Sequence, residues 1–86
     1  MKKYRLVKYD VWGNDEDGYQ VNDIYQTDTI LRFKGVPTDG QIIKALQKYA
    51  YNNMRSGDVD FPGMGDGTVI YIDFDGKPLC ELRLED

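Results

Sequence analysis

The segment that most constrains the fold of this chain is residues 38–53, which has the spacing of an amphipathic helix. Thr38 is followed three residues later by Gln41, the pattern of a capping box in which each side chain bonds to the other's backbone. Apolar residues then recur at intervals of three and four and fall on one side, namely Ile42, Ile43, Leu46, Tyr49 and Ala50. The segment predicts one helix, running to about Asn53, that packs with its apolar side on the rest of the protein.

Much of the remaining chain alternates between apolar and polar residues in short runs, which is typical of β-strands. These runs are residues 4–12, 19–25, 29–33, 68–74 and 78–84. Turn-forming residues separate the first three runs, at 13–18 and at 26–28. Because 86 residues are about the size of one domain, we expect a single domain over residues 1–86. Its expected fold class is α+β, with one helix packed on an antiparallel sheet and the element order β-β-β-α-β-β.

Two connections receive a more specific prediction. Residues 56–67 contain four Gly and one Pro, so we expect a long loop there, of a kind that is often functional. In the last hairpin we expect a three-residue loop, residues 74–76, with Asp73 opposite Lys77. That loop places the two isoleucines of the preceding strand on the face of Pro78, Cys80, Leu82 and Leu84.

Several classes of chemistry are excluded by residues that the chain lacks. It has no histidine, and Ser56 and Cys80 are its only serine and cysteine. A Ser-His-Asp or Cys-His arrangement and a zinc site built on His and Cys are therefore impossible within one chain. We expect no enzymatic activity, no metal site and no cofactor. No run approaches the roughly 20 apolar residues of a membrane span, and one cysteine allows no internal disulfide, so we expect a cytoplasmic protein.

Charge is unevenly distributed along the chain, whose net charge is −4. Residues 10–28 carry six carboxylates and no Lys or Arg, and residues 57–76 carry five carboxylates and again no base. Basic residues gather in the ranges 2–8 and 32–55. This distribution predicts surface patches of opposite sign.

The first predicted hairpin resembles a known block of sequence. The block consists of the runs Tyr9-Asp10-Val11-Trp12-Gly13-Asn14, Asp17-Gly18-Tyr19 and Val21-Asn22-Asp23. It is similar to one in short reading frames of tailed bacteriophages, to which no activity is attached. The resemblance covers residues 9–23 and implies a viral origin and a location in the host cytoplasm. For a small phage protein without catalytic residues, it also implies a role in binding, such as inhibition of a host-defence protein or sequestration of a nucleotide.

We therefore expect a non-enzymatic interaction protein that binds and inhibits or modulates a host protein, such as a nuclease or another defence component. Acidic loops with two aromatic anchors would form the contact, through Trp12, Asp15, Glu16, Asp17, Asp58, Asp60, Phe61 and Asp66. The first alternative is a domain that binds a small ligand or nucleotide through Lys44, Lys48, Tyr51, Arg55, Gly63 and Gly65. The second is a nucleic-acid-binding protein, which a pI near 4.7 disfavours. An exposed edge strand, such as residues 78–84, would allow a homo-oligomer.

Overall fold

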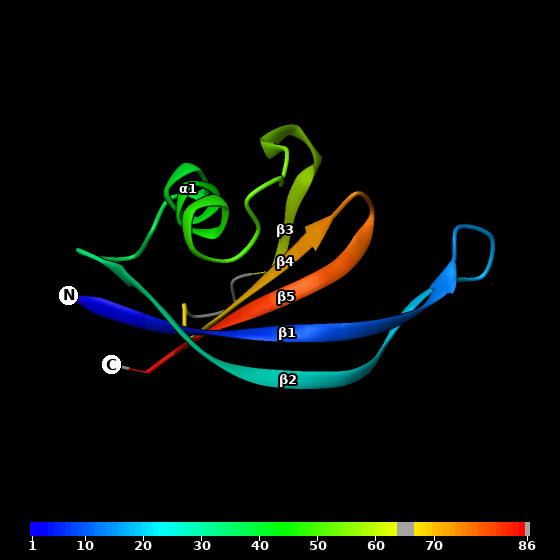
Figure 1. Cartoon of the computed structure of the whole chain (residues 1–86), viewed down its shortest axis with the longest axis horizontal. Helices are drawn as coiled ribbons and strands as arrows, with labels where there is room; N and C mark the ends of the chain where they lie inside the picture. Colours follow the sequence, from blue (N-terminus) through cyan, green and yellow to red (C-terminus); the bar gives the residue numbers. More distant parts are fainter. Residues whose placement is uncertain (64–66, 86) are drawn as a thin grey trace.

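The computed structural model describes residues 1–63 and 67–85. In this part of the chain the elements follow one another as β1 (Lys2–Asn14), β2 (Gly18–Phe33), α1 (Asp39–Tyr49), a 3-10 helix η1 (Ser56–Asp58), β3 (Val59–Gly63), β4 (Val69–Phe74) and β5 (Lys77–Leu84). The strands form one antiparallel sheet in the spatial order β2-β1-β5-β4-β3. The short helix α1 lies over one face of this sheet (Figure 1).

The element order expected from the sequence, β-β-β-α-β-β, is wrong. In the described residues the helix follows two strands and precedes three. Residues 19–25 and 29–33 belong to the single strand β2, and residues 59–63, expected to be part of a loop, form β3. Strand β5 is paired on both sides, with β1 and β4, so it is not the exposed edge expected to pair with a second copy. The sheet has β2 and β3 at its edges.

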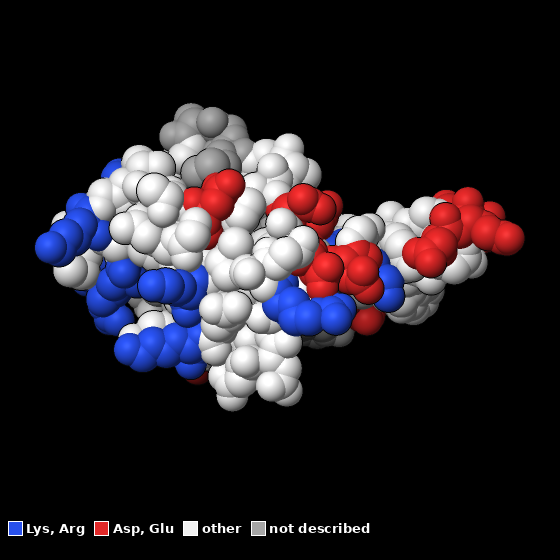
Figure 2. Space-filling view, turned by 90° about the horizontal axis from the view of Figure 1, so that it is seen from above, with Lys and Arg blue, Asp and Glu red and all other residues white. Residues whose placement is uncertain are grey.

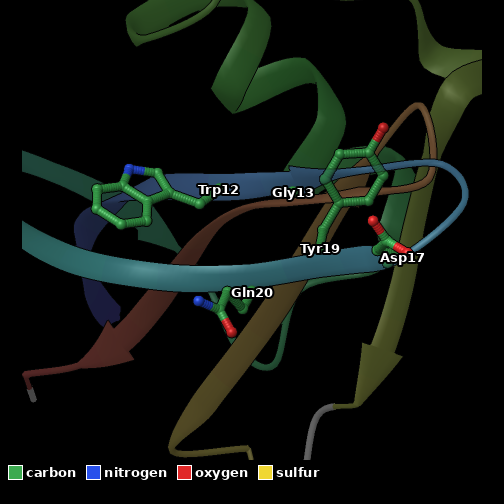
Figure 3. Close-up of a pocket in the computed structure, with 6 residues that line it drawn as sticks. Trp12, Gly13, Asp17, Tyr19 and Gln20 are labelled. Carbon is green, nitrogen blue, oxygen red and sulfur yellow. The ribbon is translucent and has the colours of Figure 1, made fainter.

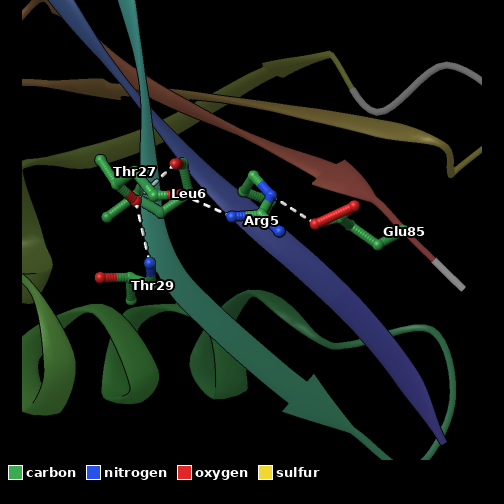
Figure 4. Close-up of polar contacts among 5 residues, drawn as sticks. All are labelled: Arg5, Leu6, Thr27, Thr29 and Glu85. Carbon is green, nitrogen blue, oxygen red and sulfur yellow. Dashed lines mark hydrogen bonds and ion pairs between the residues drawn. The ribbon is translucent and has the colours of Figure 1, made fainter.

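Strand β2 is continuous because the polar residues at its middle form a bulge instead of a turn. The pairing shifts between Arg5, opposite Ile30, and Val7, opposite Gln26. The Thr27 hydroxyl donates to the Leu6 carbonyl at 2.7 Å and accepts from the Thr29 amide at 3.2 Å (Figure 4). These bonds replace the ladder bonds that the extra residues interrupt, and the strand bends without reversing.

Strand β3 was not predicted because the composition of its residues is typical of a loop. Pro62 has no N–H to donate, which costs little in an edge strand or at a bulge, and β3 has both features. Its pairing with β4 shifts between Asp60 and Gly63. Val59 and Phe61 still alternate with their polar neighbours and pack against the core.

The helix begins as the sequence predicts. The Gln41 amide donates to the Thr38 hydroxyl at 3.3 Å, and the Thr38 amide donates to the Gln41 side chain at 2.9 Å, so the capping box is confirmed. The helix ends at Tyr49, before the predicted Asn53, where the amides of Ala50 and Tyr51 both donate to the carbonyl of Leu46. Tyr49, expected on the apolar side of the helix, lies outside the core and is 59% exposed.

The core lies between the helix and one face of the sheet. Ile42 and Leu46 of α1 are fully buried against it. The strands and the segment after the helix contribute Tyr4, Leu6, Leu31, Phe33, Met54, Ile70, Ile72, Cys80 and Leu82. In the part of the chain that the structure describes, the opposite face of the sheet carries no helix (Figure 1).

The three-residue loop predicted for the last hairpin is wrong. Phe74 pairs with Lys77, so the turn has two residues, Asp75 and Gly76, with φ angles of +54° and +76°. Positive φ at both positions is the geometry of a type I′ turn. A shift between Ile72 and Asp73 then restores the alternation, so Ile72 pairs with Cys80, whereas Asp73 faces Pro78 and not Lys77. The shared buried face of the two strands therefore results from a bulge and not from a three-residue loop.

The first hairpin projects from the rest of the sheet. Strand β1 pairs with β5 only as far as Lys8, opposite Cys80. Beyond it, the described residues of β1 and β2 pair only with each other as a two-stranded ribbon. We call residues 9–25 the arm, with Tyr25 at its base opposite Lys8. The arm extends the molecule to 41 Å along its longest axis, against 24 and 23 Å along the other two (Figure 1).

Candidate interaction surfaces

The tip of the arm is an ordered turn that presents three carboxylates. The Asn14 side-chain oxygen accepts the amides of Glu16 at 3.0 Å and Asp17 at 2.7 Å, so the asparagine closes the turn locally. Asp15, Glu16 and Asp17 are exposed at this turn. The turn therefore holds a dense negative charge at one end of the molecule (Figure 2).

The two strands of the arm leave no room for a side chain at Gly13. Its φ is +128°, and a Cβ added there would lie 2.1 Å from the Gly18 carbonyl oxygen, so only glycine fits. Gly13 pairs with Tyr19, whose ring stands beside it in Figure 3, while Trp12 points away along the arm. A shallow hollow of about 250 Å³ lies here, lined by Trp12, Gly13, Asp17, Gly18, Tyr19 and Gln20.

Tyr19 joins the arm tip to the turn between β4 and β5. Its hydroxyl donates to the Asp15 carboxylate at 2.5 Å, and this bond is the main cause of a raised Tyr19 pKa. The Lys77 ammonium lies 5.4 Å from the Tyr19 ring centroid, within the range of a cation–π contact. These contacts give the arm a defined direction.

The arm exposes apolar side chains on both of its faces. Trp12 is 57% exposed and lies on the same face of β1 as Lys8, whose partner across the strands is Tyr25, 52% exposed. On the other face lie Val21 and Ile24, which are 42% and 43% exposed. A two-stranded ribbon has no third strand or helix to cover such residues, so they are available for a partner.

A polar network fixes the base of the arm to the centre of the sheet. Glu81 is only 7% exposed, yet both of its oxygens are bonded: one accepts the Tyr9 hydroxyl at 2.8 Å and the other accepts the Arg83 Nε at 2.5 Å. Burial, followed by the bond to Glu81, raises the pKa of Tyr9 well above its usual value of 10. Val7, 1% exposed, pairs with Glu81. The network is satisfied and serves to position the arm.

The end of the molecule opposite the arm tip carries a basic groove. It runs between the end of β2 and α1 and has a volume of about 750 Å³. The cations that line it are Arg32, Lys34, Lys44 and Lys48, and we call this groove the basic groove. Figure 2 shows Lys and Arg gathered at this end, far from the acidic tip. The exposed Tyr49 belongs to the groove wall, with the Lys48 ammonium 5.2 Å from its ring centroid.

The predicted partner-binding residues are divided between several places. Trp12 and the three carboxylates after Asn14 lie together on the arm. Asp58 lies in η1, where it pairs with Arg55 at 2.9 Å and its carbonyl accepts the Asp75 amide. Asp60 is exposed on β3. Phe61 is half-buried against the core and so is not a free anchor, and Asp66 lies outside the described residues.

The predicted ligand-binding residues do not form one site. Lys44 and Lys48 line the basic groove, but Tyr51 lies under the ammonium of Lys8 at 5.1 Å and packs against the core, and Arg55 is engaged by Asp58. Gly63 is a strand residue opposite Tyr71 and not part of a phosphate-binding loop. Gly65 lies outside the described residues.

The sequence did not single out Arg32, Lys34 and Tyr49 as groove residues. The sequence shows that the region 32–55 is basic. The pairing of β2 with β1 and the return of the chain into α1 determine which of its cations lie together. Tyr49, which the helical spacing places on the apolar side, is exposed at the last position of α1.

Comparison with known protein families, with curated proteins and with solved structures finds no match. No helix of the described residues is long and apolar enough to cross a membrane. Within residues 1–63 and 67–85, no three carboxylate or cysteine side chains are grouped so that they could hold a metal ion. The surfaces described above are therefore the basis for a functional proposal.

Proposed function

We propose that this protein is a non-enzymatic interaction protein that binds another protein through its arm. The observation that carries the proposal is the exposure of Trp12, where β5 no longer flanks the ribbon, and of Tyr25 at the base of the ribbon opposite Lys8. Aromatic side chains of this kind supply much of the binding energy in protein interfaces. Gly13 and the Asn14 turn hold the ribbon in a defined shape, so little conformational freedom would be lost on binding.

The acidic tip supports a partner with a basic surface. Asp15, Glu16 and Asp17 stand at the far end of the arm, where they would meet a partner before the aromatic residues do. Complementary charge accelerates such encounters and selects among partners. A protein whose natural ligand is nucleic acid has such a basic surface. A host nuclease or defence component fits this description, in line with the phage-like block of residues 9–23.

The test is site-specific photo-crosslinking in bacterial cells. A photoreactive phenylalanine derivative replaces Trp12 in one variant, Tyr25 in a second and Ser56 in a third; Ser56 is exposed in η1 and belongs to neither strand of the arm. We expect the first two variants to give the same discrete protein adduct and the third to give none. Adducts from position 56 alone, or equal adducts from all three positions, would contradict binding through the arm.

Removing the charges of the arm tip distinguishes their effect on the association rate from the contact that the aromatic residues make. The triple variant D15N/E16Q/D17N keeps side-chain size and is combined with the photoreactive residue at position 12. We expect the adduct from position 12 to form more slowly in this variant and to lose most of its salt dependence, because rim charges act mainly on the association rate. An unchanged rate and salt dependence would remove the tip from the contact.

A further inference from the structure

The basic groove has a feature that the arm does not explain: its cations form no ion pair with a carboxylate of the described residues. In the described residues the ion pairs are Arg5 with Glu85, Arg55 with Asp58 and Arg83 with Glu81. None of these pairs involves a cation of the basic groove. The neighbouring strand adds Lys3, which pairs with Arg32 across the β1–β2 ladder, so the positive charge continues past the groove.

An exposed aromatic ring accompanies these cations. Tyr49 is 59% exposed and lies in the groove wall beside Lys48. A groove of positive charge with an aromatic ring is the arrangement by which proteins bind single-stranded nucleic acid, with phosphates on the cations and a base on the ring. A carboxylate-rich protein would use the cations but would gain nothing particular from the ring.

The net charge of −4 does not oppose such binding at this place. The acidic tip and the basic groove lie at opposite ends of a molecule that is 41 Å long (Figure 2). At physiological salt an exposed charge is largely screened beyond about 8 Å. A ligand in the groove therefore experiences Arg32, Lys34, Lys44 and Lys48 and not the charge of the whole chain.

We propose that the basic groove binds single-stranded nucleic acid, with backbone phosphates on its four cations and one base stacked on Tyr49. Tyr49 is close enough to Lys48 for the same nucleotide to contact both. The Thr38 and Gln41 side chains bond to each other's backbone in the capping box, so the cations and the ring carry the recognition. This site is separate from the arm and is independent of the partner proposed for it.

Salt-dependent binding of a short fluorescent oligothymidylate tests the proposal with the full chain. Four phosphate contacts to a single strand give a slope of about −2.8 in log affinity against log salt, which is roughly a 50-fold loss of affinity between about 50 and about 200 mM. The variant K44Q/K48Q should reduce the slope by about 1.4. The variant R55Q/K77Q removes the same charge outside the groove and should leave the slope unchanged. Equal effects of the two variants, or no binding at low salt, would overturn the proposal.

Tyr49 provides a second readout that a simple phosphate site would not give. We expect Tyr49→Ala to weaken oligothymidylate binding roughly tenfold and Tyr49→Phe to retain it, because stacking needs the ring and not the hydroxyl. Tripolyphosphate competing as well as the oligonucleotide, with no effect of Tyr49→Ala, would overturn the nucleic-acid assignment. A peptide copying residues 13–19 that binds the groove more tightly than the oligonucleotide would also overturn it, in favour of an acidic protein segment such as the arm of a second copy.

Discussion

The hydroxyl of Tyr9 donates a 2.8 Å hydrogen bond to the buried carboxylate of Glu81, and this bond joins the first residue of the arm to the central strand β5. The Arg83 guanidinium forms an ion pair with the other oxygen of the same carboxylate. Glu81 is thus tolerated at a nearly buried position because both of its oxygens have partners. The arm begins where this network ends, so the network determines the direction in which the arm leaves the sheet.

Removing the Tyr9 hydroxyl should destabilise the protein without removing the ring. Tyr9→Phe leaves one oxygen of a buried carboxylate without its partner, which costs about 1–2 kcal/mol of unfolding free energy. Urea denaturation measures this loss. Tyr71→Phe is the matched control, because Tyr71 is 44% exposed on the same face and should change stability by less than about 0.5 kcal/mol. Equal losses in the two variants would show that the bond to Glu81 does not contribute.

Cys80 should make stability depend on alkaline pH. Burial raises the pKa of its thiol from 9.0 to about 12. The folded chain therefore keeps the thiol proton at pH values where the unfolded chain has lost it. The stabilising contribution is complete below about pH 9 and is lost as the pH rises from about 9 to about 12.

The comparison of wild type with Cys80→Ala isolates this effect. Between about pH 9 and about pH 11, wild type should lose up to about 1.4 kcal/mol of unfolding free energy per pH unit more than the variant. The variant starts from a lower stability because it leaves a cavity, so the slopes are compared and not the absolute values. Parallel slopes, together with rapid alkylation of native Cys80 by iodoacetamide, would show that the thiol is accessible and its pKa ordinary.

The capping box should contribute a measurable share of the stability of α1. Thr38→Ala removes the acceptor for the Gln41 amide and should cost about 1 kcal/mol, whereas Thr38→Ser retains an oxygen there and should cost much less. Thermal unfolding followed by circular dichroism distinguishes the two. A loss in Thr38→Ser as large as in Thr38→Ala would point to the lost methyl group and not to the cap.

The features that the sequence predicted are those whose partners lie close together in the chain. The helix start depends on Thr38 and Gln41, which are three residues apart. The arm turn depends on Asn14 and the amides of Glu16 and Asp17. The bonds in each case are formed within a few residues, so the local pattern is sufficient. The acidic tip was predicted for the same reason.

The features that the sequence missed depend on distant partners. Residues 27–29 have the composition of a turn. They form a bulge because the Thr27 hydroxyl donates to the Leu6 carbonyl and the Thr27 carbonyl accepts from the Arg5 guanidinium, both far away in the sequence. Residues 59–63 have the composition of a loop, but they form a strand because their backbone pairs with β4. The basic groove combines Arg32 with Lys44, and only the path of the chain from β2 into α1 brings these cations together. Local propensity cannot supply such contacts.

The last prediction concerns Gly13 in the arm. Gly13→Ala places a Cβ 2.1 Å from the Gly18 carbonyl oxygen at a φ of +128°, so the strands must separate or the residue must leave its conformation. We expect a loss of about 1–3 kcal/mol. Trp12 is the only tryptophan and adjoins this position, so its fluorescence anisotropy should fall as the arm loosens. Gly57→Ala is the control, because a Cβ there meets nothing within 4 Å and the φ is not positive. Its stability should be unchanged or rise by up to about 1 kcal/mol. A Gly13→Ala variant with normal stability and anisotropy would mean that the tip turn tolerates a wider arm, and that the arm is not preorganised for its partner.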